Sequence, residues 1–173
     1  MKELISIREF EVFEKDFQQI LLRGKGDEKF EKVIQEKFLD SAPNENLSII
    51  KNESFLFAKQ SFDQWSIIFL NKKKHNEFNK IISDINSNEE MLASDYSYGQ
   101  VYFEVTGNKR NFYLNKLTHF DLRPKVFKKF SVAQTLVARI DCTIYNLGEK
   151  YLISCNKSFE DYFKKRLMDS TIY

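Results

Sequence analysis

The stretch DYSYGQVYFEVTGNKRNFYLNKLTHFDL, residues 95–122, decides the fold. Residues 96–99 have the composition of a turn, and residues 100–106 that of a strand in which apolar and polar side chains alternate. The Gly-Asn pair at residues 107–108 breaks the strand, because both residue types tolerate positive φ angles. A helix is then expected over residues 109–119. The stretch therefore predicts a strand that leads directly into a helix.

The same layout recurs along the chain. Each copy has an apolar strand of about five residues, a polar break with Asn or Gly, and a helix. The three copies cover residues 65–82, 101–117 and 151–167. A further strand-like run precedes each copy, at residues 54–59, 91–95 and 135–145. The copies are unequally spaced, which favours repeated β-β-α units inside one domain over a solenoid.

Length and order of elements indicate the fold class. A chain of 173 residues is long enough for one domain with a substantial core. We expect an N-terminal arm over residues 1–15 and a single domain over residues 16–173. Strand pairs that alternate with helices favour an α+β fold, in which helices pack on a mainly antiparallel sheet.

Composition argues against several classes of partner. The formal net charge is only +2, although 30% of residues are charged, so the chain shows no electrostatic footprint for nucleic acid. The run Lys72–Lys74 is expected to be a solvated turn. No apolar run approaches the length of a membrane span, and residues 1–10 do not resemble a signal peptide. We therefore expect no membrane association and a cytoplasmic location.

Few residues suggest chemistry. His75 and His119 are the only histidines, and neither has a second metal ligand at helical spacing. The glycines are scattered, so there is no phosphate-binding loop. Cys142 and Cys155 would lie on the two arms of a hairpin, where they are either buried small hydrophobes or a disulfide. We therefore expect no catalytic, cofactor-binding or metal-binding residues in this chain.

Three aspartates stand beside aromatic residues at the ends of elements. Asp63, Asp95 and Asp121 are either bases with a raised pKa or turn anchors. Trp65 could stack on a planar ligand, but the apolar strand around it favours a position in the hydrophobic core.

A set of short motifs in one order is similar to those of the gamma subunit of heterotetrameric sarcosine oxidase, over about residues 17–168. The matching positions are Leu22-Arg23-Gly24, Pro43-Asn44, Asp63-Gln64-Trp65, Asp95-Tyr96-Ser97-Tyr98-Gly99, Gly107, Asp121-Leu122 with Pro124 and Phe127, Thr135-Leu136-Val137-Ala138, and Ser158-Phe159-Glu160-Asp161-Tyr162. The Asp-x-Ser-x-Gly segment also resembles the aminomethyltransferase and folate-binding superfamily. The resemblance implies a folate-binding type of α+β domain.

The resemblance also implies a function. The gamma subunit of that family is a non-catalytic component that packs against the alpha subunit, and with it the beta and delta subunits. FAD, FMN, NAD and tetrahydrofolate are expected in those partner subunits. The complex demethylates sarcosine or a related N-methyl amino acid and passes the one-carbon unit to tetrahydrofolate. We expect partner contacts at Tyr96, Tyr98, His119 and Arg123. The sequence leaves open whether the isolated chain forms a homo-oligomer through the surface that its partner would cover.

Two alternatives remain open at this stage. Tyr96 and Tyr98 could simply cover the end of the sheet instead of contacting a partner. The chain could also be a stand-alone folate- or small-molecule-binding module, or a one-carbon transferase with Asp95 as its base.

Overall fold

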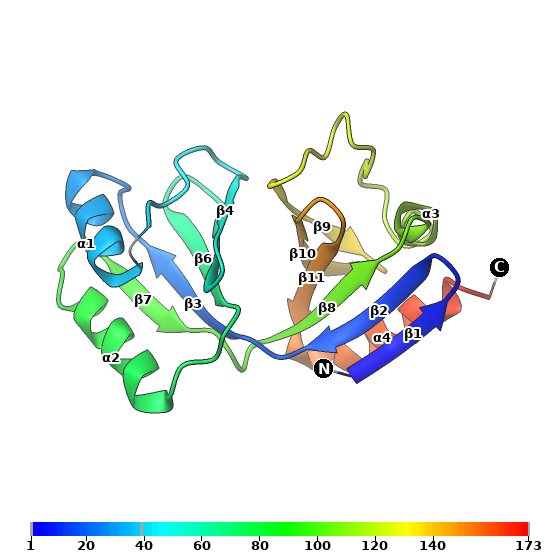
Figure 1. Ribbon diagram of the computed structural model, residues 1–173, viewed down its shortest axis with the longest axis horizontal. Coiled ribbons are helices and arrows are strands. Elements are labelled where there is room, and N and C mark those ends of the chain that lie inside the picture. Colours follow the sequence, from blue (N-terminus) through cyan, green and yellow to red (C-terminus); the bar gives the residue numbers. More distant parts are fainter. Residues whose placement is uncertain (1, 39, 173) are drawn as a thin grey trace. The chain divides into compact units, whose positions relative to one another are not determined.

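The computed structural model describes residues 2–38 and 40–172, and the chain divides into two compact units (Figure 1). Unit 1 comprises Met1–Asp16 and Gly99–Tyr173, and unit 2 comprises Phe17–Tyr98. Unit 2 is thus continuous in the sequence, and unit 1 is built from both ends of it. No helix among the described residues is long and apolar enough to cross a bilayer.

Unit 2 is a five-stranded antiparallel sheet with the strand order β4-β5-β6-β3-β7. Its elements in chain order are β3 (Gln18–Arg23), α1 (Glu28–Phe38), β4 (Ile49–Lys51), β5 (Phe55–Lys59), β6 (Gln64–Phe69), α2 (His75–Asn86) and β7 (Leu92–Asp95). The apolar stripes of α1 and α2 pack on the sheet, and Phe38 and Phe78 both contact the ring of Phe69. Strand β6 is buried along almost its whole length, as its apolar sequence predicted.

Unit 1 is a six-stranded antiparallel sheet with the order β1-β2-β8-β11-β10-β9. Its elements are β1 (Lys2–Ile7), β2 (Phe10–Lys15), β8 (Gln100–Thr106), α3 (Arg110–Leu114), β9 (Val132–Val137), β10 (Ile140–Asn146), β11 (Tyr151–Asn156), the short 3-10 helix η1 (Lys157–Phe159) and α4 (Glu160–Asp169). Helix α4 buries Phe163 and Leu167 in the core of this unit, where Phe163 meets Phe103 of β8 with ring centroids 5.1 Å apart.

The two units follow the same path. In unit 2 the chain runs β3-α1-β4-β5-β6-α2, and in unit 1 it runs β8-α3-β9-β10-β11-α4, with matching positions in the two sheets. In unit 2 the next strand, β7, pairs antiparallel with β3. In unit 1 the corresponding place beside β8 is taken by β2, from the start of the chain. The fold therefore contains a twofold internal repeat.

The α+β class with antiparallel sheets is confirmed, and the repeated layout can now be placed. The runs at residues 54–59 and 151–167 belong to true hairpins followed by helices, β5-β6-α2 and β10-β11-α4. In the middle copy β7 and β8 lie in different sheets, so they do not form a hairpin. Strand spacing along the sequence did not reveal which strands pair.

Three local expectations differ from the structure. Residues 2–15 form the β1-β2 hairpin instead of a separate arm. Strand β2 pairs with β8, and its Val12 is buried in the core of unit 1. The run at residues 135–145 is not one strand, since Ala138 and Arg139 form a two-residue turn between β9 and β10. Helix α3 ends at Leu114 instead of residue 119.

Candidate functional site

The four residues expected to contact a partner lie on the surface as two pairs. Tyr96 and Tyr98 follow β7 in unit 2, with 38% and 86% of their surface exposed. His119 and Arg123 follow α3 in unit 1, and both are exposed. The turn of the first pair, and Arg123 of the second, are held by hydrogen bonds within their own units.

The turn that carries the two tyrosines is anchored by Asp95. One oxygen, Oδ1, accepts hydrogen bonds from the backbone N–H of Ser97 at 2.9 Å and from its hydroxyl at 2.6 Å. The same hydroxyl accepts a bond from the N–H of Gln19 at 3.0 Å, and the N–H of Tyr96 bonds to the Gln19 carbonyl. Asp95 thus acts as a turn anchor, and the ring of Tyr98 is left facing solvent.

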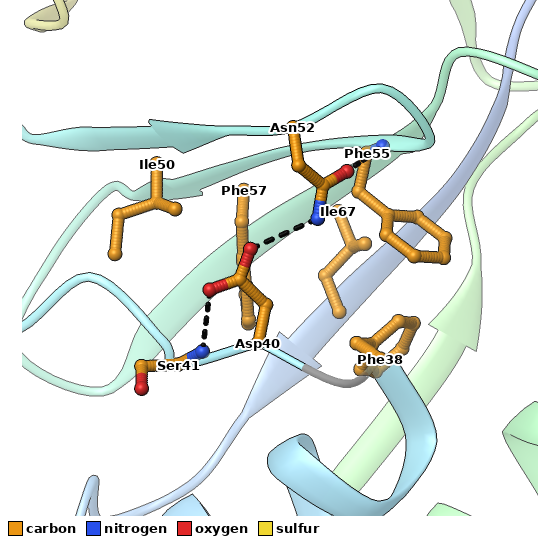
Figure 2. A pocket seen from close by; sticks show the side chains of 8 residues that line it. All are labelled: Phe38, Asp40, Ser41, Ile50, Asn52, Phe55, Phe57 and Ile67. Carbon is orange, nitrogen blue, oxygen red and sulfur yellow. Dashed lines mark hydrogen bonds between the residues drawn. The ribbon is translucent and has the colours of Figure 1, made fainter.

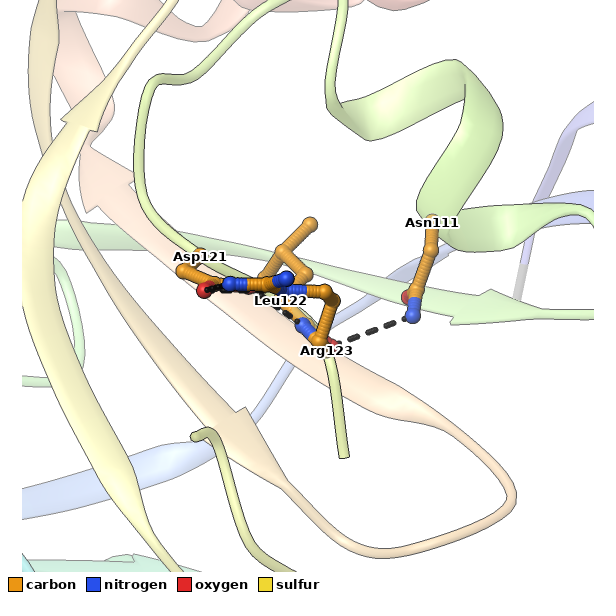
Figure 3. Close-up of polar contacts among 4 residues, drawn as sticks. All are labelled: Asn111, Asp121, Leu122 and Arg123. Atoms are coloured by element: carbon orange, nitrogen blue, oxygen red, sulfur yellow. Dashed lines mark hydrogen bonds and ion pairs between the residues drawn. The ribbon is translucent and has the colours of Figure 1, made fainter. Parts of the chain in front are cut away.

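The segment after α3 is held by a second aspartate (Figure 3). The guanidinium of Arg123 donates from Nε to both carboxylate oxygens of Asp121, at 2.9 and 3.0 Å, and from a terminal nitrogen at 2.5 Å. Asn111 of α3 donates to the carbonyl of the intervening, buried Leu122 at 3.1 Å. The hydrogen bonds from the side chain and the backbone N–H of Arg123 lower the pKa of Asp121 to about 2, so the idea of a base with a raised pKa is wrong for this residue.

Asp63 is also a structural residue. Its carboxylate accepts from the Ser61 hydroxyl at 2.9 Å and from Arg23 at 3.0 Å, and its carbonyl accepts from the N–H of Gly24. Beside it Trp65 is 1% exposed, and its indole N–H donates to the carbonyl of Pro43 at 3.1 Å. Trp65 is therefore a core anchor, and its polar edge is satisfied inside unit 2.

Figure 2 shows a small pocket of unit 2 whose polar residues bind one another. Its lining is Phe38, Asp40, Ser41, Ile50, Asn52, Phe55, Phe57 and Ile67. Asn52 donates to Asp40 at 2.9 Å, and its own carbonyl accepts from the N–H groups of Ser54 and Phe55 at 2.8 Å. The free volume of about 10 Å³ is close to that of one water molecule. Asn52 therefore closes the turn before β5 and ties it to Asp40.

The two cysteines are buried free thiols directly opposite each other on β10 and β11. A hydrogen bond to Cys155 and burial raise the pKa of the Cys142 thiol. Across residues 2–38 and 40–172, no group of three or more His, Cys, Asp and Glu side chains is placed to hold a metal ion.

A wider groove lies in unit 1, between the end of α3, the β9-β10 turn and α4. It encloses about 540 Å³. Its lining is Asn115, Lys116, Leu117, Thr118, His119, Leu136, Ala138, Arg139, Tyr162 and Arg166. Among the expected interface residues, His119 lines this groove. The other basic side chains were missed by sequence reasoning, because they are brought together from segments 20 or more residues apart.

Comparison with solved structures shows the fold type. The chain is similar to the heterotetrameric sarcosine oxidase from Corynebacterium sp. U-96 in complex with pyrrole 2-carboxylate, with a TM-score of 0.84 and 16% identity over 97% of this chain and 86% of the other. It is also similar to the glycine cleavage system aminomethyltransferase T from Bartonella henselae, with a TM-score of 0.68 and 11% identity over 93% of this chain. That match spans 46% of the aminomethyltransferase chain, about half its length. These likenesses confirm the expected aminomethyltransferase-like fold.

Comparison of sequences gives the family. No curated protein sequence matches the chain significantly. The profile of the sarcosine oxidase, gamma subunit family matches residues 46–172, which is more than half of the chain. This region includes β6, the Asp95 turn and all of unit 1 from β8 to α4. The chain therefore belongs to the sarcosine oxidase gamma subunit family.

Proposed function

We propose that this protein is a non-catalytic gamma-type subunit that acts in the assembly of a sarcosine oxidase complex. The observation that carries the proposal is the family match over residues 46–172. The similarity in fold to a chain of a heterotetrameric sarcosine oxidase, over 97% of this chain, supports it. The complex would demethylate sarcosine oxidatively and pass the one-carbon unit to tetrahydrofolate.

The roles of the three aspartates support the non-catalytic part of the proposal. Asp63, Asp95 and Asp121 accept hydrogen bonds from side chains or backbone groups next to them in the fold. Asp121 also forms an ion pair with Arg123 that keeps it ionised far below neutral pH. The Asp121 carboxylate therefore stabilises its turn and is a poor proton acceptor.

The proposal assigns partners and cofactors as follows. This chain packs against the alpha subunit, and through it joins the beta and delta subunits in the cytoplasm. FAD, FMN, NAD and tetrahydrofolate are bound by those subunits. The exposed Tyr98 and Tyr96 are suitable partner contacts, because an aromatic ring with a polar hydroxyl is favoured at protein interfaces.

Co-purification tests this function. The full chain is expressed with the alpha, beta and delta subunits of the same source, and the mixture is separated by size exclusion. Co-elution with the flavoprotein subunits in a fixed ratio is expected, and absorbance at flavin wavelengths should follow the large subunits when this chain is left out. Elution of the chain apart from every other subunit would contradict the proposal.

The alternative function is a stand-alone folate-binding module, favoured by the similarity in fold to aminomethyltransferase T. Calorimetric titration of the isolated chain with tetrahydrofolate separates the two functions. We expect no heat of binding at micromolar concentrations of the ligand. Micromolar affinity for tetrahydrofolate would favour the stand-alone module. Self-association of the isolated chain is consistent with the subunit role, because the surface for the partner is then uncovered.

A further inference from the structure

We propose that the groove of unit 1 receives an acidic segment of the partner subunit. The inference rests on the proposed function and adds to it the place and the chemistry of the contact. We name this site the basic groove, defined by the basic side chains Lys116, His119, Arg139 and Arg166 and the apolar or aromatic side chains Leu136 and Tyr162.

The charge of the basic groove is not balanced by its own lining. The described lining residues include three permanently cationic side chains and a histidine, but no carboxylate. Arg166 has one acidic neighbour outside the lining, Asp169 at 3.1 Å. Neither His119 nor Arg139 has a hydrogen bond or ion pair with any described residue. Several like charges on a concave surface strengthen the local electrostatic potential, which favours binding of a group of opposite charge.

A depression of similar size in unit 2 provides a contrast. It is lined by both lysines and acidic side chains, and Glu90 pairs with Lys25 and, at 3.8 Å, with Lys29. That surface is neutralised by its own residues. Only the basic groove, of the two, presents a charge that a partner would have to balance.

The walls of the basic groove are fixed by hydrogen bonds between its three segments. The N–H of Ala138 donates to the Leu117 carbonyl at 2.7 Å, and the Thr118 hydroxyl donates to the Leu136 carbonyl at 2.7 Å. The hydroxyl of Tyr162 on α4 donates to the carbonyl of Ala138 at 3.0 Å. A site that is already rigid loses little conformational entropy when a segment binds, so its contacts contribute more fully to affinity.

The position of Arg139 is the second observation. Ala138 and Arg139 have φ angles of 53° and 68°, as both central residues of a type I′ hairpin turn require. Asn and Gly are the residues that favour this conformation, because a larger side chain is crowded there. An arginine whose guanidinium has no partner within the described chain is thus unfavourable for the turn itself. A carboxylate from a partner accounts for its presence, since guanidinium and carboxylate form paired hydrogen bonds.

The apolar part of the groove fits a polypeptide better than a free ion. Leu136 is 54% exposed and Tyr162 is 44% exposed, although each is in a regular element. An acidic segment could place its carboxylates on Arg139 and Lys116 and an apolar side chain on Leu136. Interfaces commonly combine such an apolar centre with a polar rim.

The test is a comparison of two arginine variants in the complete chain, with binding to the purified alpha subunit measured by calorimetry. Arg139→Asn removes the charge and places a residue that accepts the left-handed conformation. Arg8→Asn is the matched control, because Arg8 is an exposed arginine in the other two-residue hairpin turn of unit 1, between β1 and β2. Arg139→Asn should bind about tenfold more weakly, with an equal or higher melting temperature. Arg8→Asn should bind like the wild type.

Equal binding of Arg139→Asn and wild type would overturn the inference and leave the proposed function standing. Failure of the wild type itself to bind any subunit would overturn both. A carbodiimide cross-link, which joins an amine to a carboxylate, locates the contact independently. Joining of Lys116 to an Asp or Glu of the alpha subunit supports the inference. Cross-links from this chain to alpha that exclude Lys116, or that join Lys116 to a second copy of this chain, overturn it.

Discussion

Gly107 marks the place where the N-terminal hairpin meets the rest of unit 1. Its φ is +98°, and a Cβ added there would lie 2.2 Å from the carbonyl oxygen of Glu9 and 2.4 Å from its carbonyl carbon. The same carbonyl accepts a hydrogen bond from the N–H of Lys109 at 2.9 Å. Replacing Gly107 by alanine therefore forces apart two backbone segments that are bonded to each other.

The expected cost has two parts. An L-residue with a left-handed φ costs about 1–2 kcal/mol relative to glycine. Overpacking against an atom that cannot rotate away costs about 1–3 kcal/mol more. Gly107→Ala should therefore lower the free energy of unfolding by about 2–5 kcal/mol, which is a large part of the stability of an ordinary domain.

Gly148→Ala is the matched control. Gly148 has a φ of +91°, but its added Cβ would meet only the side-chain carbons of Lys129, at 2.9 Å, and these can move. The control should lose only the conformational part, about 1–2 kcal/mol. Urea unfolding followed by circular dichroism measures both variants, while the fluorescence of Trp65 reports on unit 2 separately. A difference below about 0.5 kcal/mol between the two variants would refute the reasoning.

Three further predictions follow from the described contacts. Asp95→Asn keeps an acceptor for Ser97 and should lower the free energy of unfolding in urea by less than about 0.5 kcal/mol, whereas Asp95→Ala should lower it by about 1 kcal/mol. If Asp95→Asn folds normally but the complex loses its activity, a role as catalytic base is favoured instead. Lysine neighbours lower the pKa of Glu160 from 4.5 to about 2, so its stabilising contribution is complete above about pH 4.5 and is lost as pH falls through about 2. Acid titration of stability should therefore be flatter in Glu160→Gln over that range, and identical curves would contradict the ion-pair argument. Cys142 and Cys155 should react with an aromatic disulfide reagent only at the rate of unfolding, and rapid labelling of the native chain would show that they are accessible.

The local part of the fold could be predicted from the sequence. The stripe of Phe30 and Ile34 predicts α1, and the alternation in residues 100–106 predicts β8, because helix and strand periods are properties of a short segment. The Ala138–Arg139 turn was missed because prediction of a turn also depends on a local signal. It contains neither Gly nor Asn, so no local signal separates β9 from β10.

The candidate site shows the same division. The exposure of Tyr98 agrees with the prediction of a turn at residues 96–99. The basic groove could not be predicted, because its basic side chains come from the segment after α3, the β9-β10 turn and α4, and no sequence spacing relates them. The low net charge of +2 gave no indication that positive side chains gather on one surface.

By itself, the sequence determined the α+β class of the protein, most of its helices and strands, and the ordered motifs that mark the gamma subunit family. Tertiary structure alone decided which strands pair, that β2 from the start of the chain completes the sheet of unit 1, and which cations share a groove. The physical reason is distance along the chain. Side-chain periodicity acts within a few residues, whereas strand pairing and surface charge depend on segments that meet only after the chain has folded.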